Sequence, residues 1–516
     1  MNKDITRRRF IASGATGAAA ALGLPLMMQS TMERALAMPD NTNLTLADYL
    51  NRFGITEQML NEIIAVGLSR GGDYCDVYFQ HTIGNYVELE DNAVNRASTQ
   101  VDLGMGVRVL LGDQTGYSFT EELTLEAMKQ AAKTAANIAA SGLKAGPAQL
   151  KLHETPNYYP IQKKWEDVAI DKKIPMLYTI NDNVFTLDKR IIKNNIYLSD
   201  ESTWILLATS TGRIACDYRP LTRLGVSCTA EENGRREQNG YNLSGRYGYE
   251  FYGADKLDLL ATEAVKRTVD LFAAVKPEAG EMPVVLGAGG SGILLHEAIG
   301  HGMEADYNRK KVSIFADKIN KPVAESFVNI IDDGTNPNVR GSLNVDDEGN
   351  DTQKTVLVEN GILRSYLHDH LSSQYYNVAP TGSGRRESFR YAPLPRMRNT
   401  YMQAGPHTRD EIIASVKKGL YAQSFTNGQV MIGAGDFTFY VKSGYLIEDG
   451  KLTKPVKDVN IIGNGPNVLR DIVMVGNDFE MDKGGWVCGK QGQGVPVSLG
   501  LPTIKVSKIT VGGVNS

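Results

Sequence analysis

The spacing of hydrophobic residues changes along the chain, and each change predicts a different kind of element. Between residues 44 and 68 apolar side chains recur every three or four positions, which is typical of amphipathic helices, and Gly71-Gly72 follows as a stop. Apolar and polar residues then alternate over short runs that end in glycine or Asp-Asn turns, which predicts an antiparallel meander. Its strands are expected at residues 74–80, 85–90, 104–111 and 115–119.

The same pattern predicts helices at 123–140, 171–188 and 257–275, with strands between them at 193–198, 203–209 and 224–232. From residue 281 onward it gives short β runs separated by Gly, Asn and Asp, with one helix among them. The expected class is α+β: an N-terminal antiparallel sheet with packed helices, followed by a β-rich C-terminal domain that carries a metal-binding helix. The predicted divisions are residues 1–37, a signal segment; 38–275, the N-terminal α+β domain; and 276–516, the catalytic domain.

The first 37 residues predict an export signal. Lys3 and the run Thr6-Arg7-Arg8-Arg9-Phe10-Ile11 precede an apolar stretch of small residues that extends to Met28. This resembles a twin-arginine signal, and the resemblance implies export of an already folded protein, with its metal loaded, to the periplasm or cell envelope. Ala35-Leu36-Ala37 offers a cleavage site, but Glu33-Arg34 beside it leaves open whether the segment is removed or stays as an anchor.

Composition excludes several classes of function. The 516 residues include 42% hydrophobic and 22% charged residues, and the formal net charge is −4 without a basic block, which argues against a nucleic-acid partner. No later stretch approaches the roughly 18 uninterrupted apolar residues of a membrane span. Four scattered cysteines do not form a disulfide scaffold. Cys216 and Cys228 flank a strand-like stretch, and either a disulfide or two free thiols would suit them.

The strongest chemical signal is His296-Glu297-Ala298-Ile299-Gly300-His301, two histidines and a glutamate on one short helix. It follows the logic of the HExxH motif of zinc peptidases with one residue added. In a regular helix, residues five apart are separated by about 140° around the axis, which is too far to hold one ion. We therefore expect a π-bulge near the second histidine, with Gly300 supplying backbone freedom.

A catalytic zinc site needs a third protein ligand. The sequence offers five candidates: Glu304, Asp306, His368, His370 and Cys488. Cys488 is favoured because glycines flank it and Lys490 would help to keep its sulfur ionised. Glu297 is then the expected general base, acting on a metal-activated water. The alternative is an ordinary surface helix with two solvated histidines.

A second motif, Gly287-Ala288-Gly289-Gly290-Ser291-Gly292, fits GxGxxG and follows a strand-like run, as a dinucleotide site would. No second parallel strand ending in an acidic residue follows about 20 residues later, as that site requires. The glycines are better explained as a sharp turn from a strand into the metal-bearing helix. A nucleotide-dependent oxidoreductase is therefore only a third interpretation.

Several ordered blocks of the C-terminal half resemble the TldD/PmbA (TldE) family, on the TldD side. The blocks are HEAIGHGMEADYNR at 296–309, IDDGT at 331–335, DDEG at 346–349, TGSGRRES at 381–388, PRMRNTY at 395–401, YLIEDGK at 445–451, VGND at 475–478 and CGKQGQ at 488–493. The resemblance implies a zinc peptidase acting on short or unfolded peptides, with one Zn²⁺ per chain on His296, His301 and Cys488, and with Glu297 as catalytic acid and base. It also implies a dimer that encloses a cavity, with the substrate added as a strand to a sheet edge. The partner would be a second copy or a PmbA/TldE-like subunit. The twin-arginine-like leader departs from the familiar cytoplasmic members.

The sequence therefore predicts an exported, TldD-like zinc peptidase. The alternative is a non-catalytic peptide-binding or assembly subunit with a structural metal site. The sequence leaves open the natural peptide, endo- or exopeptidase action, the oxyanion-stabilising groups, and whether the partner is identical. It also leaves open whether four arginines bind substrate or form internal ion pairs: Arg385, Arg386, Arg396 and Arg398.

Overall fold

The computed structural model describes residues 44–138 and 146–513, and within them the protein has the α+β architecture that the sequence predicts. The predicted signal segment, residues 1–37, lies outside the described residues. Among the residues that are described, none of the helices combines the length and the apolar character needed to cross a membrane.

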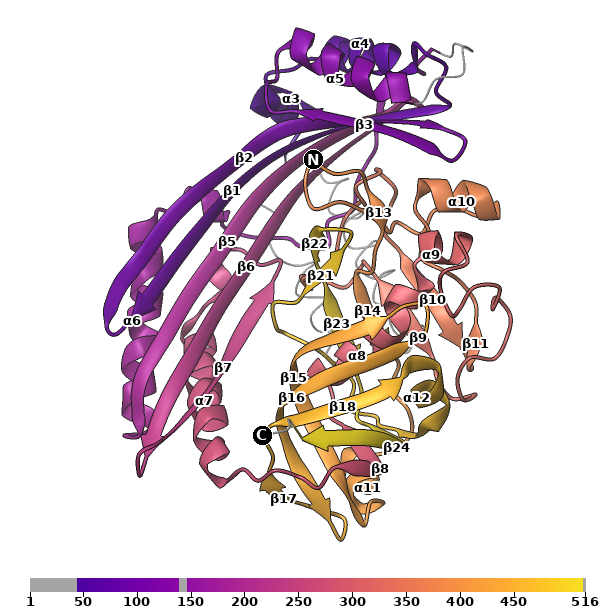
Figure 1. Cartoon of the computed structure of the whole chain (residues 1–516). Helices are drawn as coiled ribbons and strands as arrows, with labels where there is room; N and C mark the ends of the chain where they lie inside the picture. The colour runs from indigo at the N-terminus through magenta and orange to yellow at the C-terminus, as the bar shows by residue number, and fades with distance from the viewer. Residues whose placement is uncertain (1–43, 139–145, 514–516) are drawn as a thin grey trace, which may run out of the picture.

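A long, curved antiparallel sheet dominates the first half of the chain (Figure 1). Its strands follow the order β3-β2-β1-β5-β6, and β7 pairs with the far part of β6, while the short β4 lies parallel to its beginning. The bounds are Tyr74–Glu90 for β1, Ala93–Leu111 for β2, Gln114–Thr120 for β3, Lys151–Leu152 for β4, Ile191–Thr209 for β5, Arg213–Glu232 for β6 and Arg235–Gly245 for β7.

The strands of this sheet are longer than the hydrophobic pattern predicts. The pattern gives two strands at 74–80 and 85–90, but β1 continues through the half-buried residues 81–84 without a break. Here His81 pairs with Leu103 of β2 and with Trp204 of β5, so hydrogen bonding on both sides carries the strand through a polar stretch. The alternation of apolar and polar residues depends on one face of a strand being buried and the other exposed, so it is weak where both faces are partly exposed.

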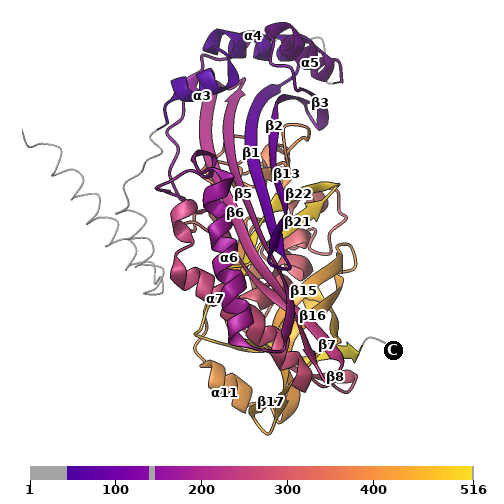
Figure 2. The same ribbon diagram turned by 90° about the vertical axis from the view of Figure 1, so that its left-hand side faces the viewer.

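Helices cover the sheet in two groups, one near each end (Figures 1 and 2). One group is α3 (Leu46–Phe53), α4 (Glu57–Leu68) and α5 (Leu125–Ile138), which share a core with β1 and β2. The other is α6 (Ile170–Leu187) and α7 (Ala254–Val269), which share a separate core with β5 and β6. The apolar stripes predicted from helical spacing are therefore the faces that pack on the sheet.

The C-terminal half is built around five strands whose pairings close into a ring. β15 pairs with β8, β8 with β24, β24 with β18, β18 with β16, and β16 again with β15. The bounds are Gly280–Leu286 for β8, Lys418–Met431 for β15, Asp436–Glu448 for β16, Val459–Asn464 for β18 and Ile504–Gly513 for β24. A closed ring leaves few free strand edges. β17 (Lys451–Pro455) and β19 (Ile472–Val475) are attached to it.

A second C-terminal sheet and a hairpin lie beside this ring. The sheet has the order β11-β10-β9-β14-β23-β20, and the hairpin pairs β21 with β22. The bounds are Ile330–Asp333 for β9, Lys354–Glu359 for β10, Ile362–Leu363 for β11, Asn399–Met402 for β14, Glu480–Met481 for β20, Val487–Lys490 for β21, Gln493–Pro496 for β22 and Ser498–Leu501 for β23. One hydrophobic core joins ring, sheet and hairpin, so the hairpin is fixed against the rest of this half.

Short elements complete this half of the chain. They are β12 (Gly384–Arg385), β13 (Leu394–Pro395), α8 (Ile293–Leu295), α9 (Ala305–Arg309), α10 (His370–Tyr376), α11 (Arg409–Ala414) and α12 (Gly465–Asp471).

The question of a disulfide between Cys216 and Cys228 is settled by the topology. Both lie on the single strand β6, where Cys216 pairs with Leu206 and Cys228 with Asn194. Twelve residues of one strand span about 40 Å, far beyond the reach of a disulfide. Both cysteines are therefore free thiols.

Candidate metal centre

The two histidines of the hexamer project from a π-helical turn, His296–Gly300, which continues α8. The backbone N–H of His301 donates to the carbonyl of His296, five residues earlier, which is the π-helical hydrogen bond. This turn absorbs the extra residue and places the two imidazoles face to edge, with ring centroids 5.1 Å apart. The predicted π-bulge is confirmed.

Gly300 serves a different purpose from the one expected. Its φ of −59° and ψ of −50° are those of an ordinary right-handed helix, so no special backbone freedom is used. A Cβ atom at this position would instead overlap the sulfur of Met397. The glycine is required because the turn approaches Met397 closely.

The hairpin β21–β22 brings Cys488 to the two histidines across 187 residues of sequence. Cys488 Sγ lies 3.4 Å from His301 Nε2, and one donor atom from each of His296, His301 and Cys488 falls within 4.8 Å of the others. All three side chains are at least 94% buried, since their exposed fractions are 2%, 6% and 3%. Two imidazoles and a thiolate in a buried cluster suit zinc.

The charge balance of the cluster favours an ionised sulfur. Burial by itself raises the pKa of Cys488, but the neighbouring His301 and His296 outweigh it and hold this pKa well below its usual value. Lys490 does not do this, contrary to expectation. Its amine is 3.1 Å from Glu304 and 2.7 Å from Asp306 instead.

Glu304 fixes the orientation of the His301 imidazole through the ring nitrogen that does not face Cys488. Its carboxylate Oε2 lies 3.0 Å from His301 Nδ1, which leaves Nε2 directed at Cys488. Burial opposes the negative charge, but Lys490 and His301 prevail and lower the pKa of Glu304 to about 2. The sequence offered Glu304 only as a candidate ligand. In the structure Glu304 contacts Nδ1 of His301, three residues earlier in the chain, and is not one of the converging donors.

Arg396 is a supporting residue whose position the sequence did not reveal. Its side chain is fully buried, and it donates to the backbone carbonyl of Cys488 and, at 3.3 Å, to that of Gln493. It therefore fixes both strands of the hairpin that carries the cysteine. No local signal points to this role, because the contact joins segments 92 residues apart.

Glu297 lies on the open side of the cluster. Its side chain is about one fifth exposed, and its Oε2 is 4.0 Å from His301 Nε2. Burial raises its pKa, while the charges of His296 and His301 act in the opposite direction. A carboxyl group at the edge of the cluster with a raised pKa suits proton transfer.

The remaining candidate ligands lie elsewhere. His368 packs against Tyr366 and Tyr376, and burial lowers its pKa to about 4. His370 stacks on Tyr74 with ring centroids 4.1 Å apart. Asp306 is bound to Lys490. None of these three belongs to the cluster that could hold an ion among the described residues.

The glycine-rich segment 287–292 connects β8 to α8 and so leads into the π-helical turn that carries His296. A Cβ at Gly292 would lie 2.8 Å from the backbone nitrogen of Gly500, which shows how closely the segment packs on β23. The carboxylates of Glu480 and Asp482 border Gly289 and Gly290. Two carboxylates at this loop would repel a phosphate, which argues against nucleotide binding.

The four arginines that the sequence left open are buried inside the protein. Arg398 is 2.7 Å from Asp332, and Arg386 is 3.2 Å from Asp76. Arg385 donates to the carbonyls of Met397 and Pro496, and Arg396 is 3.9 Å from Glu304. Three of the four thus have carboxylate neighbours, and all four have internal partners.

Comparison with known proteins decides the family. Residues 75–139 match the PmbA/TldA metallopeptidase domain 1, residues 163–272 the central domain, and residues 279–513 the C-terminal domain. The Metalloprotease TldD homolog of Haemophilus influenzae is 41% identical over 468 residues, covering 89% of this chain and 97% of that relative. The chain belongs to the TldD/PmbA metallopeptidase family. The predicted family is therefore confirmed.

A further relative agrees in sequence, and two solved structures share the fold. The Zinc metalloprotease TldD homolog of Saccharolobus solfataricus is 31% identical over 446 residues, covering 86% of this chain and 97% of that relative. A Thermotoga maritima protein named as a modulator of DNA gyrase has the same fold, with a TM-score of 0.73 at 19% identity over 88% of this chain and all of that one. TldE from Thermococcus kodakarensis gives 0.69 at 18% identity, over 88% of this chain and all of its own.

Proposed function

We propose that this protein is a zinc-dependent peptidase that hydrolyses short or unfolded peptides. One observation carries the proposal: the donor atoms of His296, His301 and Cys488 converge within 4.8 Å, and Glu297 stands at the edge of the cluster. His296 Nδ1 is also buried without a hydrogen-bond partner among the described residues, as expected for a group that awaits a ligand. The donor set therefore fits zinc.

His296, His301 and Cys488 would hold the ion, which when bound lowers the pKa of a water molecule and polarises the scissile carbonyl. Glu297 accepts a proton from the attacking water and delivers it to the leaving amine, and its raised pKa suits both roles. Glu304 keeps the Nδ1–H of His301 engaged, so that Nε2 faces the cluster. Arg396 holds the hairpin at Cys488.

The direct test is a cleavage assay on a mixture of unstructured peptides, read by mass spectrometry. We expect cleavage by the zinc-loaded chain, loss of cleavage after chelation, and recovery when zinc is returned. A chain that retains one zinc and binds these peptides without cleaving any of them would favour the alternative, a non-catalytic binding subunit.

We also propose that the protein is exported by the twin-arginine route to the periplasm or cell envelope and acts as a dimer. The support is the sequence of residues 1–37 and the likeness to TldE, which suggests a PmbA/TldE-like partner or a second copy. Replacing Arg7, Arg8 and Arg9 by lysine should retain the protein in the cytoplasm on fractionation. Native mass spectrometry should give a dimer, and a monomer would contradict that part.

A further inference from the structure

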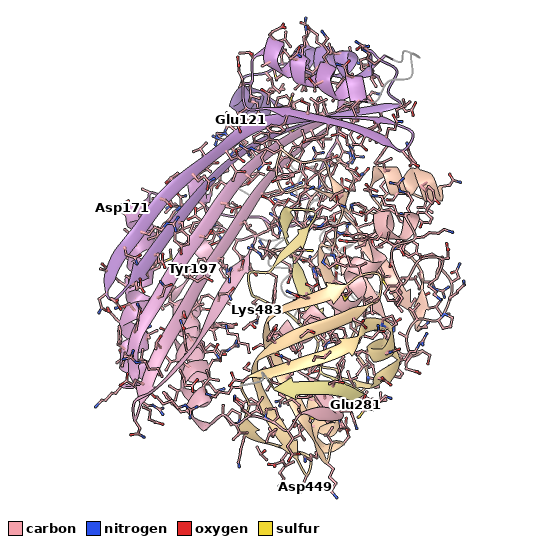
Figure 3. The ribbon with its side chains drawn as sticks, in the orientation of Figure 1. Glu121, Asp171, Tyr197, Glu281, Asp449 and Lys483 are labelled. Atoms are coloured by element: carbon pink, nitrogen blue, oxygen red, sulfur yellow. The ribbon has the colours of Figure 1, made fainter. Side chains whose placement is uncertain are left out.

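Two cavities adjoin each other between the long sheet and the C-terminal half. One has a volume of 470 Å³ and the other 430 Å³, and Arg223, Tyr241 and Lys442 line both. The first cavity reaches Trp486 and Val487, directly before Cys488. We call the two together the groove. It extends from Tyr197 on β5 to Lys483, which lie on the long sheet and on the neighbouring C-terminal half in Figure 3.

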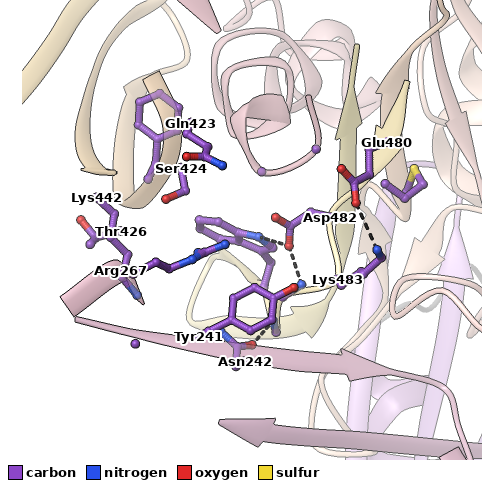
Figure 4. Close-up of a pocket in the computed structure, with 18 of the residues that line it drawn as sticks. Tyr241, Asn242, Arg267, Gln423, Ser424, Thr426, Lys442, Glu480, Asp482 and Lys483 are labelled. Carbon is purple, nitrogen blue, oxygen red and sulfur yellow. Dashed lines mark hydrogen bonds and ion pairs between the residues drawn. The ribbon is translucent and has the colours of Figure 1, made fainter. Parts of the chain in front are cut away.

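Most charged side chains that line the groove are neutralised by a neighbour. Lys483 is 3.1 Å from Glu480, and these two lie on the side of the groove opposite Lys442 and Arg267 (Figure 4). The other ion pairs are Lys457 with Glu237, Arg267 with Glu263, and Asp458 with Lys276. Asp482 accepts a hydrogen bond from the indole of Trp486.

Arg223 and Lys442 are the cations of the groove without such a partner. Among the described residues neither has a carboxylate within ion-pair distance. Arg223 donates to Asn242 at 3.3 Å and lies over the ring of Tyr197, while Lys442 has no hydrogen-bond partner in the described part of the chain. Burial, reinforced by Arg267 and Arg223, lowers the pKa of Lys442 to about 8. The half-buried positive charge is therefore uncompensated, and an incoming anion would relieve the cost.

The position of Arg223 and Lys442 in the groove indicates which anion they would bind. Trp486 and Val487 line the groove and directly precede Cys488, so the groove borders the segment that carries the third donor of the centre. Neighbouring residues of a strand face opposite sides, so a peptide lying along this segment can present one residue to Cys488 and another to the groove. A peptide substrate carries such an anion as a side-chain carboxylate or as its C-terminus.

We propose that Arg223 and Lys442 bind a carboxylate of the peptide, and that the enzyme prefers peptides with an acidic side chain or a free C-terminus in this groove. The inference rests on the proposed peptidase function and adds a substrate class to it. Side-chain and terminal carboxylates offer the same chemistry, so the test must separate them.

The test uses four peptides of one sequence, carrying either Glu or Gln inside and either a free or an amidated C-terminus. Their binding to the zinc-loaded Glu297→Gln variant is measured by fluorescence anisotropy, so that hydrolysis does not interfere. We expect Lys442→Gln or Arg223→Gln, added to this variant, to weaken the binding of the matching carboxylate peptide about tenfold, which is about 1.4 kcal/mol. Binding of the doubly neutral peptide should not change.

Lys508→Gln is the matched control, because Lys508 is exposed and lines a separate cavity beside β18 and β24. It should leave all four affinities unchanged, and thermal melts should show that every variant is folded. Equal weakening of neutral and acidic peptides, or no preference before Lys442 is changed, would overturn the inference. Cleavage of neutral and acidic peptides at equal rates would also overturn it while leaving the peptidase intact. Charge-selective binding without any cleavage would instead refute the proposed function alone.

Discussion

Cys75 and Cys488 are both buried, but their surroundings give the two thiols opposite properties. Cys75 lies on the long sheet with an exposed fraction of 0%, and burial raises its pKa far above the usual value. Cys488, at 3%, has its pKa lowered far below that value because two histidines adjoin it. Burial alone therefore makes a thiol inert, whereas the two neighbouring imidazoles make the thiol of Cys488 suitable for binding a metal.

Charged groups differ between the two regions in the same way. Arg108 on the long sheet is 2.6 Å from both Asp76 and Glu348, so its charge is neutralised between the sheet and the C-terminal half. At the candidate metal centre the donor atoms of His296, His301 and Cys488 instead lie within 4.8 Å of one another. In the first arrangement opposite charges offset each other, and in the second three potential metal ligands lie together.

The largest expected effect belongs to Glu297 at the edge of the centre. Glu297→Gln should lower the rate of peptide hydrolysis by about 10²–10⁴-fold, because the amide cannot accept the proton. The zinc content should stay at one per chain, because Glu297 is not among the three donors. Steady-state kinetics beside elemental analysis check this, and full activity with full zinc would contradict the assigned role.

Removing the charge of Arg108 should affect the fold and leave the centre unchanged. Arg108→Met leaves Glu348 buried without a counter-charge and leaves Asp76 with Arg386 alone, and we expect the free energy of unfolding to fall by about 3–5 kcal/mol. Urea denaturation measures it. The control is Arg364→Met, because Arg364 and Glu359 form an exposed pair that should contribute less than about 1 kcal/mol. Equal losses in the two variants would contradict the distinction.

A smaller effect is expected at Glu304, which contacts Nδ1 of His301. Glu304→Gln weakens the hold on His301 Nδ1, and zinc affinity should fall by about 10–100-fold, measured by competition with a chelator. Glu62→Gln, which alters an exposed pair with Lys129, should leave the affinity unchanged. Unaltered zinc binding in both variants would show that Glu304 does not orient the ligand.

The smallest effect is a dependence of stability on pH. The pKa of Glu304 is lowered to about 2, so the ionised group stabilises the folded state above its unfolded value of about 4.5. This contribution is lost as the pH falls from about 4.5 toward 2. In the metal-free protein, the difference in unfolding free energy between wild type and Glu304→Gln should therefore shrink across this window. A difference that stays constant from pH 6 to pH 3 would be inconsistent with the ion pairs described.

Local pattern predicts the helices and the class of fold well. The stripe of apolar residues in 44–68 corresponds to α3 and α4, and the Ala-rich run corresponds to α5. The pattern fails where pairing rather than burial sets the length of an element, as at residues 81–84 of β1. Ring closure by β15 and β16 also depends on contacts between distant strands, which alternation does not report.

The sequence predicts those features of the candidate site that depend on residues close together in the chain. The spacing of His296 and His301 is enough to indicate the π-turn, because a regular helix cannot bring the two rings to one ion. The predicted roles of Gly300 and Lys490 are wrong, because each is fixed by a distant neighbour, Met397 in one case and Glu304 with Asp306 in the other. The local sequence does not indicate a binding role for Lys442, since a single lysine in a strand is typical of an exposed surface position.

We expect Cys488 to complete a zinc centre in which no other cysteine can replace it. The most direct measurement is the zinc content per chain by elemental mass spectrometry, for wild type, Cys488→Ala and Cys75→Ala, each purified without chelator. We expect about one zinc in wild type and Cys75→Ala and far less in Cys488→Ala. Equal zinc in all three proteins, or none in wild type, would contradict it.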